Sequence, residues 1–289
     1  MFRNSLSRMS SQLQMPKIVY GTAWKKERTT ELVIAAVKSG FRGIDTACQP
    51  KHYREDLVGK ALSTLIAEGV VKREEMYIQT KFTSIDGQDQ SQPLPYDSKA
   101  PIPEQVKQSI ATSLKNLGVD YIDSVILHSP LRTREQTLEA YRTLEDFVSQ
   151  GKVRELGVSN CYDPKVLKSL IVEAKVKVGV VQNRWYEGNG WDWAIHDICQ
   201  QSGIRYQSFW TLSGSPTLLR HPALINLANK YSLTPEQTMY KICQIWNITP
   251  LCGSTTLSHV NEALAVEGAT GLKEDTPEVK QLWDAMHGV

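Results

Sequence analysis

The chain has no apolar run long enough to span a bilayer and no sustained run of Lys and Arg, and its formal net charge at pH 7 is only +2. The first absence argues against a membrane-spanning helix. The other two leave no electrostatic footprint for a nucleic-acid partner. Its 289 residues, 41% hydrophobic and 22% charged, have the composition of an ordinary globular protein. We therefore expect neither a membrane nor a nucleic acid as partner.

Cysteine is also scarce, with five residues in the chain and no CxxC pair among them. An odd number of scattered thiols argues against a disulfide framework and against a zinc site. Free thiols of this kind are typical of a reducing compartment, so the sequence predicts a cytoplasmic protein without a bound metal. The residues concerned are Cys48, Cys161, Cys199, Cys243 and Cys252.

The N-terminal segment MFRNSLSRMSSQLQ is polar, carries Arg3 and Arg8, and contains no acidic residue. Such a composition has a slight likeness to an organelle transit peptide. Because the segment is so short, we interpret residues 1–15 as a flexible extension. Residues 16–289 are then expected to form one domain.

Short apolar runs bounded by turn residues recur along the rest of the chain, as expected of strands that are buried on both faces. They cover residues 17–23, 42–47, 76–82, 121–127, 153–160, 178–185, 204–210 and 249–255. Helical patterns fall between them, at residues 30–39, 103–117, 135–150, 164–174, 192–202 and 235–246. Eight strands that alternate with helices predict an α/β fold, a (β/α)8 TIM barrel. The competing doubly wound sheet lacks support, since GTAWKK stands where a GxGxxG would follow the first strand.

Four chemically active residues lie at or just beyond the ends of these predicted strands. Asp45 closes GFRGID, Lys81 closes MYIQTK and His128 closes YIDSVILH, while Tyr53 follows shortly after Asp45. In a parallel barrel the C-terminal strand ends converge on one face. The sequence therefore predicts a single site that combines an acid, a phenol, an amine and an imidazole.

Several segments together resemble the aldo-keto reductase family: GFRGIDTA, REDLVGKAL, QTKF, VILHSP and KVRELGVSN. The resemblance runs from about residue 16 to about residue 265. It implies an oxidoreductase that reduces aldehydes or ketones with NADPH on a (β/α)8 barrel. Around Tyr53 the spacing departs from the family's pattern, because Glu55 follows one residue sooner and the preceding loop CQPKH is longer. His52 is the neighbouring candidate for the phenol's position.

Carbonyl reduction explains the four residues chemically, because the developing alkoxide must receive a proton. An unperturbed phenol, with a pKa of about 10, is a weak acid near neutrality. A nearby ammonium from Lys81 would lower the pKa of Tyr53, and Asp45 would hold that ammonium in place. Tyr53 then acts as the general acid. His128 would donate a hydrogen bond to the carbonyl oxygen and orient the substrate.

The resemblance also implies a set of residues that bind the cofactor. Short polar side chains at the ends of the fifth and sixth strands would grip the nicotinamide carboxamide, and Phe209 would stack on the nicotinamide ring. A slip of one residue would give that place to Trp210. Backbone amides near Ser213 and Gly214 would bind the pyrophosphate. The cofactor residues in these regions are Gly21, Thr22, Ser159, Asn160, Gln182, Phe209, Leu212 and Ser213.

The largest departure from the family's pattern follows the eighth strand. Gly253 stands in place of a lysine and His259 in place of an arginine, whereas Ser254 and Glu262 are retained. Loss of two cations weakens the electrostatic recognition of the 2′-phosphate of NADPH. Ser254, near an expected helix N-terminus, still offers anion-binding groups. We predict NADPH as the cofactor, with NADH or dual use as the alternative.

Trp24, Trp185 and the long polar loop at residues 83–103 are expected to wall the pocket for a small-molecule carbonyl substrate. Two other functional interpretations remain open. One is a non-catalytic NADP(H)-binding barrel that serves as a redox sensor or regulatory subunit. The other is an isomerase or aldolase that uses Lys81 as a Schiff-base amine, which leaves Tyr53 and His128 without a role.

Overall fold

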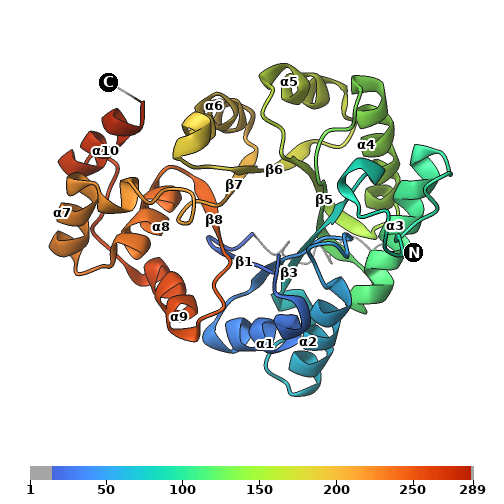
Figure 1. Cartoon of the computed structure of the whole chain (residues 1–289), viewed down its shortest axis with the longest axis horizontal. Coiled ribbons are helices and arrows are strands. Elements are labelled where there is room, and N and C mark those ends of the chain that lie inside the picture. The colour runs from blue at the N-terminus through green and yellow to red at the C-terminus, as the bar shows by residue number, and fades with distance from the viewer. Residues whose placement is uncertain (1–14, 288–289) are drawn as a thin grey trace, which may run out of the picture.

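The structure is a computed structural model that describes residues 15–287. Eight parallel strands close into a barrel in chain order, and the last strand pairs with the first (Figure 1). Closure confirms the predicted (β/α)8 barrel and excludes the open doubly wound sheet. The strands are β1 Val19–Gly21, β2 Gly43–Asp45, β3 Tyr77–Phe82, β4 Ile122–Leu127, β5 Val153–Ser159, β6 Val178–Arg184, β7 Arg205–Phe209 and β8 Ile248–Cys252. The expected extension at residues 1–15 lies outside the described residues except for Met15.

Helices surround the barrel, and the six predicted ones are all present. They are α1 Thr29–Ser39, α3 Ile102–Leu117, α4 Arg134–Ser149, α5 Pro164–Glu173, α6 Trp193–Ser202 and α8 Pro235–Ile245. Four more α-helices are present in the described chain, besides short 3-10 turns: α2 Glu55–Ala67, α7 Pro222–Tyr231, α9 Leu257–Ala265 and α10 Pro277–His287. Two starts follow the expected capping chemistry. Asp163 accepts a hydrogen bond from the amide of Lys165 at 2.8 Å, and Thr234 accepts one from Gln237 at 3.1 Å.

The strands place alternate side chains inside and outside the barrel, as the two-residue period of a strand requires. On β3, Ile78 is buried outside the barrel lumen among the apolar core residues, while Gln79 and Lys81 meet polar partners from other strands inside it. The outward set packs with the helices in one continuous apolar core. The inward set forms the floor and walls of the site at the C-terminal strand ends.

The C-terminal helix α10 packs against the outside of the barrel, beside α7 (Figure 1). Its anchor is a cluster of tryptophans, in which the ring centroid of Trp283 lies 4.7 Å from that of Trp193 and 5.0 Å from that of Trp246. This packing leaves the barrel mouth uncovered by the described C-terminal segment. No helix between residues 15 and 287 combines the length and apolar character needed to cross a membrane.

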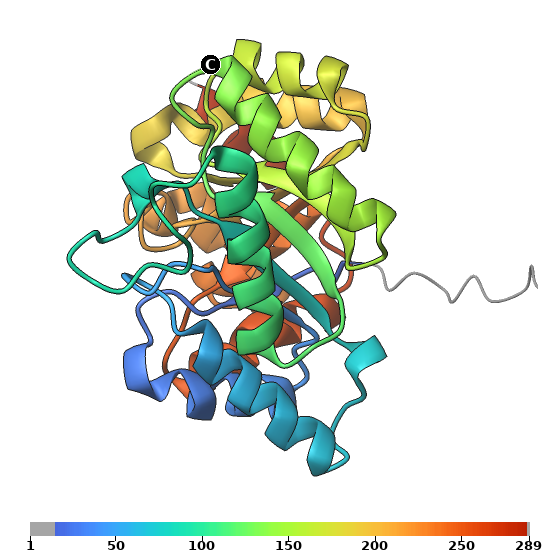
Figure 2. The ribbon, with the colours of Figure 1, turned by 90° about the vertical axis from the view of Figure 1, so that its right-hand side faces the viewer.

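The loop that connects β3 to α3 projects from one end of the barrel (left in Figure 2). Three hydrogen bonds fix it, one within the loop and two to neighbouring segments. The Tyr96 hydroxyl donates to the Thr83 carbonyl at 2.7 Å, and the Gln88 amide donates to the Cys48 carbonyl at 3.0 Å. Thr112 of α3 donates to the Pro95 carbonyl at 3.0 Å. These hydrogen bonds hold the loop in place beside the C-terminal strand ends.

Candidate active site

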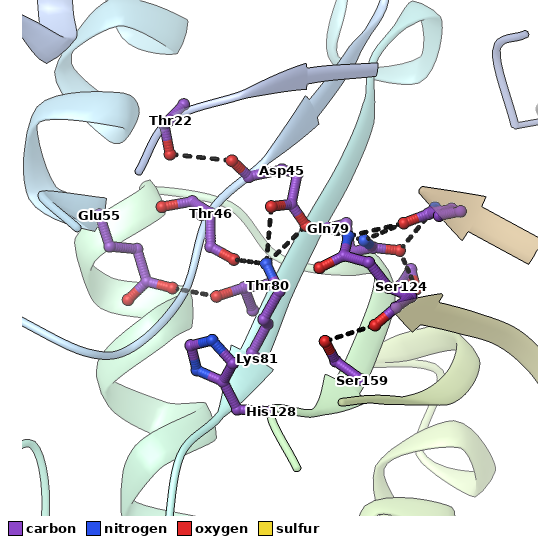
Figure 3. Close-up of polar contacts among 12 residues, drawn as sticks. Thr22, Asp45, Thr46, Glu55, Gln79, Thr80, Lys81, Ser124, His128 and Ser159 are labelled. Atoms are coloured by element: carbon purple, nitrogen blue, oxygen red, sulfur yellow. Dashed lines mark hydrogen bonds and ion pairs between the residues drawn. The ribbon is translucent and has the colours of Figure 1, made fainter. Parts of the chain in front are cut away.

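Asp45 and Lys81, at the ends of neighbouring strands, form a buried ion pair (Figure 3). The Lys81 ammonium donates to both carboxylate oxygens of Asp45 at 2.6 Å and to the carbonyl of Thr46 at 2.9 Å. An ammonium has three donors, so all of them are used here. The pair therefore holds a carboxylate and an ammonium in fixed positions at the barrel mouth, with no net charge between them.

A turn in the inserted loop brings Tyr53 to this pair. The amides of His52 and Tyr53 both donate to the Gln49 carbonyl, at 3.2 and 3.0 Å. The centroid of the Tyr53 ring then lies 5.2 Å from the Lys81 nitrogen and 5.8 Å from the centroid of the His128 ring. The longer loop therefore offsets the shorter spacing to Glu55. The structure brings together all four residues that the strand-end pattern predicted.

The expected lowering of the Tyr53 pKa by Lys81 is not found. Burial raises the pKa of the Tyr53 phenol well above its ordinary value, and the Asp45 carboxylate adds to the rise. The three donors of Lys81 bond to Asp45 and Thr46, and in the resting site the neighbouring Asp45 carboxylate offsets the effect of the ammonium on the phenol. Among residues 15–287, no group hydrogen-bonds to the Tyr53 hydroxyl. The phenol is therefore protonated near neutral pH and has a donor free for a ligand.

His128 is neutral, because burial, reinforced by the charges of Lys81 and His52, lowers its pKa to about 3. Its Nδ1 atom lies 2.6 Å from the hydroxyl oxygen of Thr83, a residue that sequence reasoning did not select. A Thr83 hydroxyl that donates to Nδ1 leaves the proton of the imidazole on Nε2. The ring then presents an N–H to the site, as a donor to a carbonyl oxygen requires.

Thr83→Val should therefore weaken catalysis without changing the shape of the site. Valine keeps the shape of threonine but removes the hydroxyl that selects the tautomer of His128. We expect kcat to fall roughly tenfold, which corresponds to about one lost hydrogen bond. Steady-state kinetics measure this, and Thr83→Ser, which restores a hydroxyl, should recover most of kcat. Equal losses in both variants would contradict the assignment of a positioning role to Thr83.

Three glutamines form the floor beneath the ion pair. Gln79 and Gln182 each donate to Asp45 Oδ1, at 2.8 and 3.0 Å, and each donates to Gln207 Oε1 at 2.7 Å. Gln79 and Lys81 thus approach the Asp45 carboxylate from different sides (Figure 3). Gln79 and Gln207 were missed at the sequence level. The available signal was their two-residue spacing from Lys81 and Phe209, which places them on the same inner face.

Ser159, Asn160 and Gln182 lie together at the ends of β5 and β6, as predicted for a carboxamide site. Their donors are largely used within the protein. Ser159 donates to the Gln182 carbonyl at 2.7 Å, and the Asn160 amide donates to the His128 carbonyl at 2.9 Å and to Ser159 at 3.3 Å. The Gln182 amide donates to Asp45 and Gln207. Ser159 and Gln182 are buried and Asn160 is half-buried, and the lone pairs that remain on their side-chain oxygens are of the type that suits the N–H groups of a carboxamide.

Phe209 ends β7 half-buried, and Trp210 follows it in a left-handed backbone conformation with φ 62°. Both rings therefore stand at the mouth. In the loop beyond, Leu212 is half-buried and Ser213 is exposed. The amide of Gly214 donates to the Trp210 carbonyl at 2.8 Å, so it is not the free pyrophosphate donor that the sequence suggested. The amide is used within the turn from Trp210 to Gly214.

The segment after β8 is open at Gly253, where an added Cβ would meet nothing within 4 Å. Helix α9 begins at Leu257, later than expected, because the Ser254 hydroxyl pairs with the backbone of Thr256. His259 is exposed in the first turn of this helix and Glu262 is half-buried further along it. The open backbone and helix N-terminus can receive a phosphate.

Lys25 supplies the cation that Gly253 lacks, and sequence reasoning missed it. Its ammonium donates to the Gly253 carbonyl at 2.8 Å and lies 4.8 Å from the centroid of the Tyr20 ring. Burial lowers the Lys25 pKa to about 8, partly offset by Cys252. The two positions are 228 residues apart in sequence, so only the pairing of β1 with β8 reveals the contact.

Two other assignments need correction. Thr22 was expected to touch the cofactor, but its buried hydroxyl donates to the Asp45 carbonyl at 2.8 Å and so positions that residue. Trp185 was expected to wall the substrate pocket, but it is fully buried, with its ring centroid 4.9 Å from that of Trp191. Strand alternation explains this: Gln182 points inward, so Trp185 points outward. By contrast, Gly21 ends β1 beside Asp45, and Trp24 is exposed and packs against His52, with ring centroids 3.8 Å apart and the rings tilted by 36°.

The fold and the site are those of a (β/α)8 barrel enzyme, in which polar residues from separate strands meet at the C-terminal face. Within residues 15–287 no group of three or more His, Cys, Asp or Glu side chains is arranged to hold a metal ion. The chain matches the family model described as "Aldo/keto reductase family" over residues 17–284, and it belongs to that family. It is accordingly an oxidoreductase of a family that reduces carbonyl compounds with NADP(H).

Several known proteins resemble the chain. "Aldo-keto reductase family 4 member C11" from Arabidopsis thaliana is 28% identical over 255 residues, which cover 80% of this chain and 74% of that protein. "NAD(P)H-dependent D-xylose reductase" from Pachysolen tannophilus is 25% identical over 309 residues, which cover 93% and 90%. Among solved structures, an aldo-keto reductase enzyme from a Medee basin deep-sea metagenome library has a TM-score of 0.79 at 26% identity, covering 96% of this chain and 93% of that one. An aldo-keto reductase of the silkworm, complexed with NADPH, has the same fold, with a TM-score of 0.78 at 24% identity over 93% and 83%.

Proposed function

We propose that this protein reduces aldehydes or ketones to alcohols with NADPH, using Tyr53 as the general acid. The observation that carries the proposal is the convergence of the Asp45–Lys81 ion pair, the Tyr53 ring and the neutral His128 at one barrel mouth. A phenol donor and an imidazole donor, neither of which is bonded on the ligand side by any of residues 15–287, suit a carbonyl oxygen that becomes an alkoxide.

The residues divide the work of moving one proton. The Tyr53 hydroxyl gives its proton to the oxygen of the substrate, which is far more basic as an alkoxide than as a carbonyl. Lys81, held by Asp45, lies close enough to the phenolate left behind to stabilise it. His128 fixes the same oxygen by an N–H bond before and during the transfer. Burial strengthens each of these interactions, because water competes less for the groups involved.

The cofactor residues fit a reduced nicotinamide dinucleotide, which supplies a hydride when it is bound. Ser159, Asn160 and Gln182 would accept the N–H groups of its carboxamide, and Phe209 offers a flat ring face beside them. At the other end, Ser254 and the first turn of α9, together with Lys25, would hold phosphate groups. Relatives named as NAD(P)H-dependent support this choice of cofactor.

Lys25 makes the binding of NADPH depend on pH. The Lys25 ammonium is present below its pKa of about 8 and is lost above it, so its attraction to a phosphate weakens as pH rises. We expect the Kd of NADPH to increase roughly tenfold between about pH 7 and about pH 9. Quenching of tryptophan fluorescence measures this. In Lys25→Met, the Kd at about pH 7 should be higher than that of the unaltered protein and should change little up to about pH 9. If the variant keeps the pH dependence of the unaltered protein, Lys25 does not have this role.

The proposed function is tested with the unaltered protein, by following NADPH oxidation against a panel of aromatic and aliphatic aldehydes and ketones. Consumption of NADPH with formation of an equal amount of alcohol is the expected result. Tight NADPH binding without turnover on any member of the panel would instead indicate the non-catalytic sensor. Borohydride trapping of a carbonyl compound on Lys81 would indicate the Schiff-base alternative, which the fully bonded, buried ammonium does not favour.

A further inference from the structure

We propose that Arg184 binds an oxyanion carried by the carbonyl substrate, so that the enzyme prefers aldehydes or ketones that bear a carboxylate or a similar anionic group. The inference rests on the proposed function and assigns to it a substrate class. It starts from Arg184 at the end of β6, which has no acidic partner within residues 15–287 and which the chemistry of proton transfer does not use.

Strand geometry places the Arg184 side chain on the inner side of the barrel mouth. On β6, Gln182 points inward to Asp45, and Asn183 points outward, where it bonds Asp192 at 2.7 Å. Arg184 therefore shares the inward side with Gln182. Its register partner on β7 is Phe209. Phe209 follows the inward-pointing Gln207 by two residues, just as Arg184 follows Gln182. The alternation thus places the Arg184 side chain at the rim of the barrel, one layer above the glutamines that form the floor of the site.

No acidic side chain among residues 15–287 pairs with Arg184, and its Nε atom is buried without a hydrogen-bond partner. Its positive charge is instead set against two aromatic faces, 5.6 Å from the centroid of Phe209 and 4.6 Å from that of Trp210. A buried donor that lacks a partner is unfavourable, because it has lost its hydrogen bonds to water without replacement. An anionic ligand with two oxygens would satisfy the guanidinium in its preferred bidentate geometry.

The neighbouring surface fits the remainder of such a substrate. Large aromatic side chains are exposed on three loops at the strand ends, with Trp24 at 64%, Trp210 at 51% and Tyr162 at 38% exposure. Both tryptophans also have a strained left-handed backbone, with φ of 63° and 62°. Exposed apolar rings and backbone strain concentrated at one mouth are typical of a binding site. The rings would contact a flat or apolar body between the anion and the carbonyl group.

A chain of hydrogen bonds fixes the position of Arg184 relative to His128. The Arg184 amide donates to the Tyr162 hydroxyl at 3.0 Å, and that hydroxyl donates to Asn160 Oδ1 at 3.3 Å. The Asn160 amide in turn donates to the His128 carbonyl at 2.9 Å. The anion site and the carbonyl-orienting histidine are therefore held in one frame, which sets the length of substrate that reaches both.

Two aldehydes of matched shape test the proposal: 4-carboxybenzaldehyde, which is anionic, and 4-carbamoylbenzaldehyde, which is neutral. We expect a higher kcat/KM for the anionic compound with the unaltered protein. In Arg184→Gln this kcat/KM should fall about 10- to 100-fold, the equivalent of one charged hydrogen-bond pair, while the value for the neutral compound changes little. Arg142→Gln, an exposed arginine on the outer helix α4, serves as the matched control and should leave both values unchanged.

The Kd of NADPH, measured in the same variants, separates the two sources of an oxyanion. If Arg184 binds a phosphate of the cofactor, Arg184→Gln will weaken NADPH binding and lower kcat/KM equally for both aldehydes, which overturns the proposal. Equal kcat/KM for the two aldehydes with the unaltered protein also overturns it. Turnover of the neutral aldehyde shows in either case that the proposed carbonyl reduction stands. Absence of turnover with both compounds and with the wider panel would instead contradict that function.

Discussion

Tyr53→Phe is expected to lower kcat by about 10²- to 10⁴-fold while leaving the binding of NADPH and the fold intact. The variant removes the proton that the developing alkoxide must receive, and neither His128 nor Lys81 can replace it. His128 is neutral and held by Thr83, and all three donors of Lys81 are bonded to Asp45 and Thr46. The phenyl ring still fills the space beside them.

The measurement is steady-state NADPH oxidation with a neutral aromatic aldehyde, accompanied by a fluorescence titration of NADPH. Since the Tyr53 hydroxyl has no hydrogen-bond partner among the described residues, its loss should change the free energy of unfolding by no more than about 0.5 kcal/mol. Tyr231→Phe, on the outer helix α7, is the matched control for removing a hydroxyl. A kcat within a few-fold of the unaltered protein would show that another group supplies the proton, and His52→Gln would then be tested.

Lys81→Met should be the most damaging single change to both stability and activity. Methionine fills the space of the lysine but leaves the Asp45 carboxylate buried with only the Gln79 and Gln182 amides as partners. Breaking a buried ion pair in this way costs about 3–5 kcal/mol. Activity should fall by at least about 10²-fold, because the phenolate of Tyr53 loses the cation that stabilises it.

The double variant Asp45→Asn with Lys81→Met isolates the cause. It removes both charges and keeps the shapes, so it should be more stable than Lys81→Met alone, although it remains inactive. Urea unfolding followed by tryptophan fluorescence compares the free energies of unfolding of Asp45→Asn, Lys81→Met, the double variant and the unaltered protein. A double variant whose loss equals the sum of the two single losses would mean that the residues do not act as a pair.

The sequence alone predicted the barrel and its strands because each strand carries its own signal. A run such as YIDSVIL is apolar, short and bounded by turn residues, and it coincides with β4 to within a residue. The same regularity located Asp45, Lys81 and His128, since each directly ends or follows a recognisable strand. Parallel closure of the barrel then sufficed to bring the three ends together.

Side-chain partners were harder to predict, because they depend on contacts between distant segments. Trp185 was selected for the pocket, but it is fully buried on the outer side of a strand whose side chains alternate. Lys25 escaped notice because it meets Gly253 only across the closing pair of strands, β1 and β8. The pKa of Tyr53 was predicted in the wrong direction, because the sequence does not show how deeply a phenol is buried.

The order of apolar and polar residues thus determined, without further information, that this chain forms eight strands and that an acid, an amine and an imidazole end three of them. Periodicity and turn chemistry are local properties, and local properties are legible in a sequence. Only the tertiary structure decided which side chains are buried, which donors are used within the protein and which charges neutralise each other. Those properties depend on burial and on distances between residues far apart in the chain, and both arise only when the barrel closes.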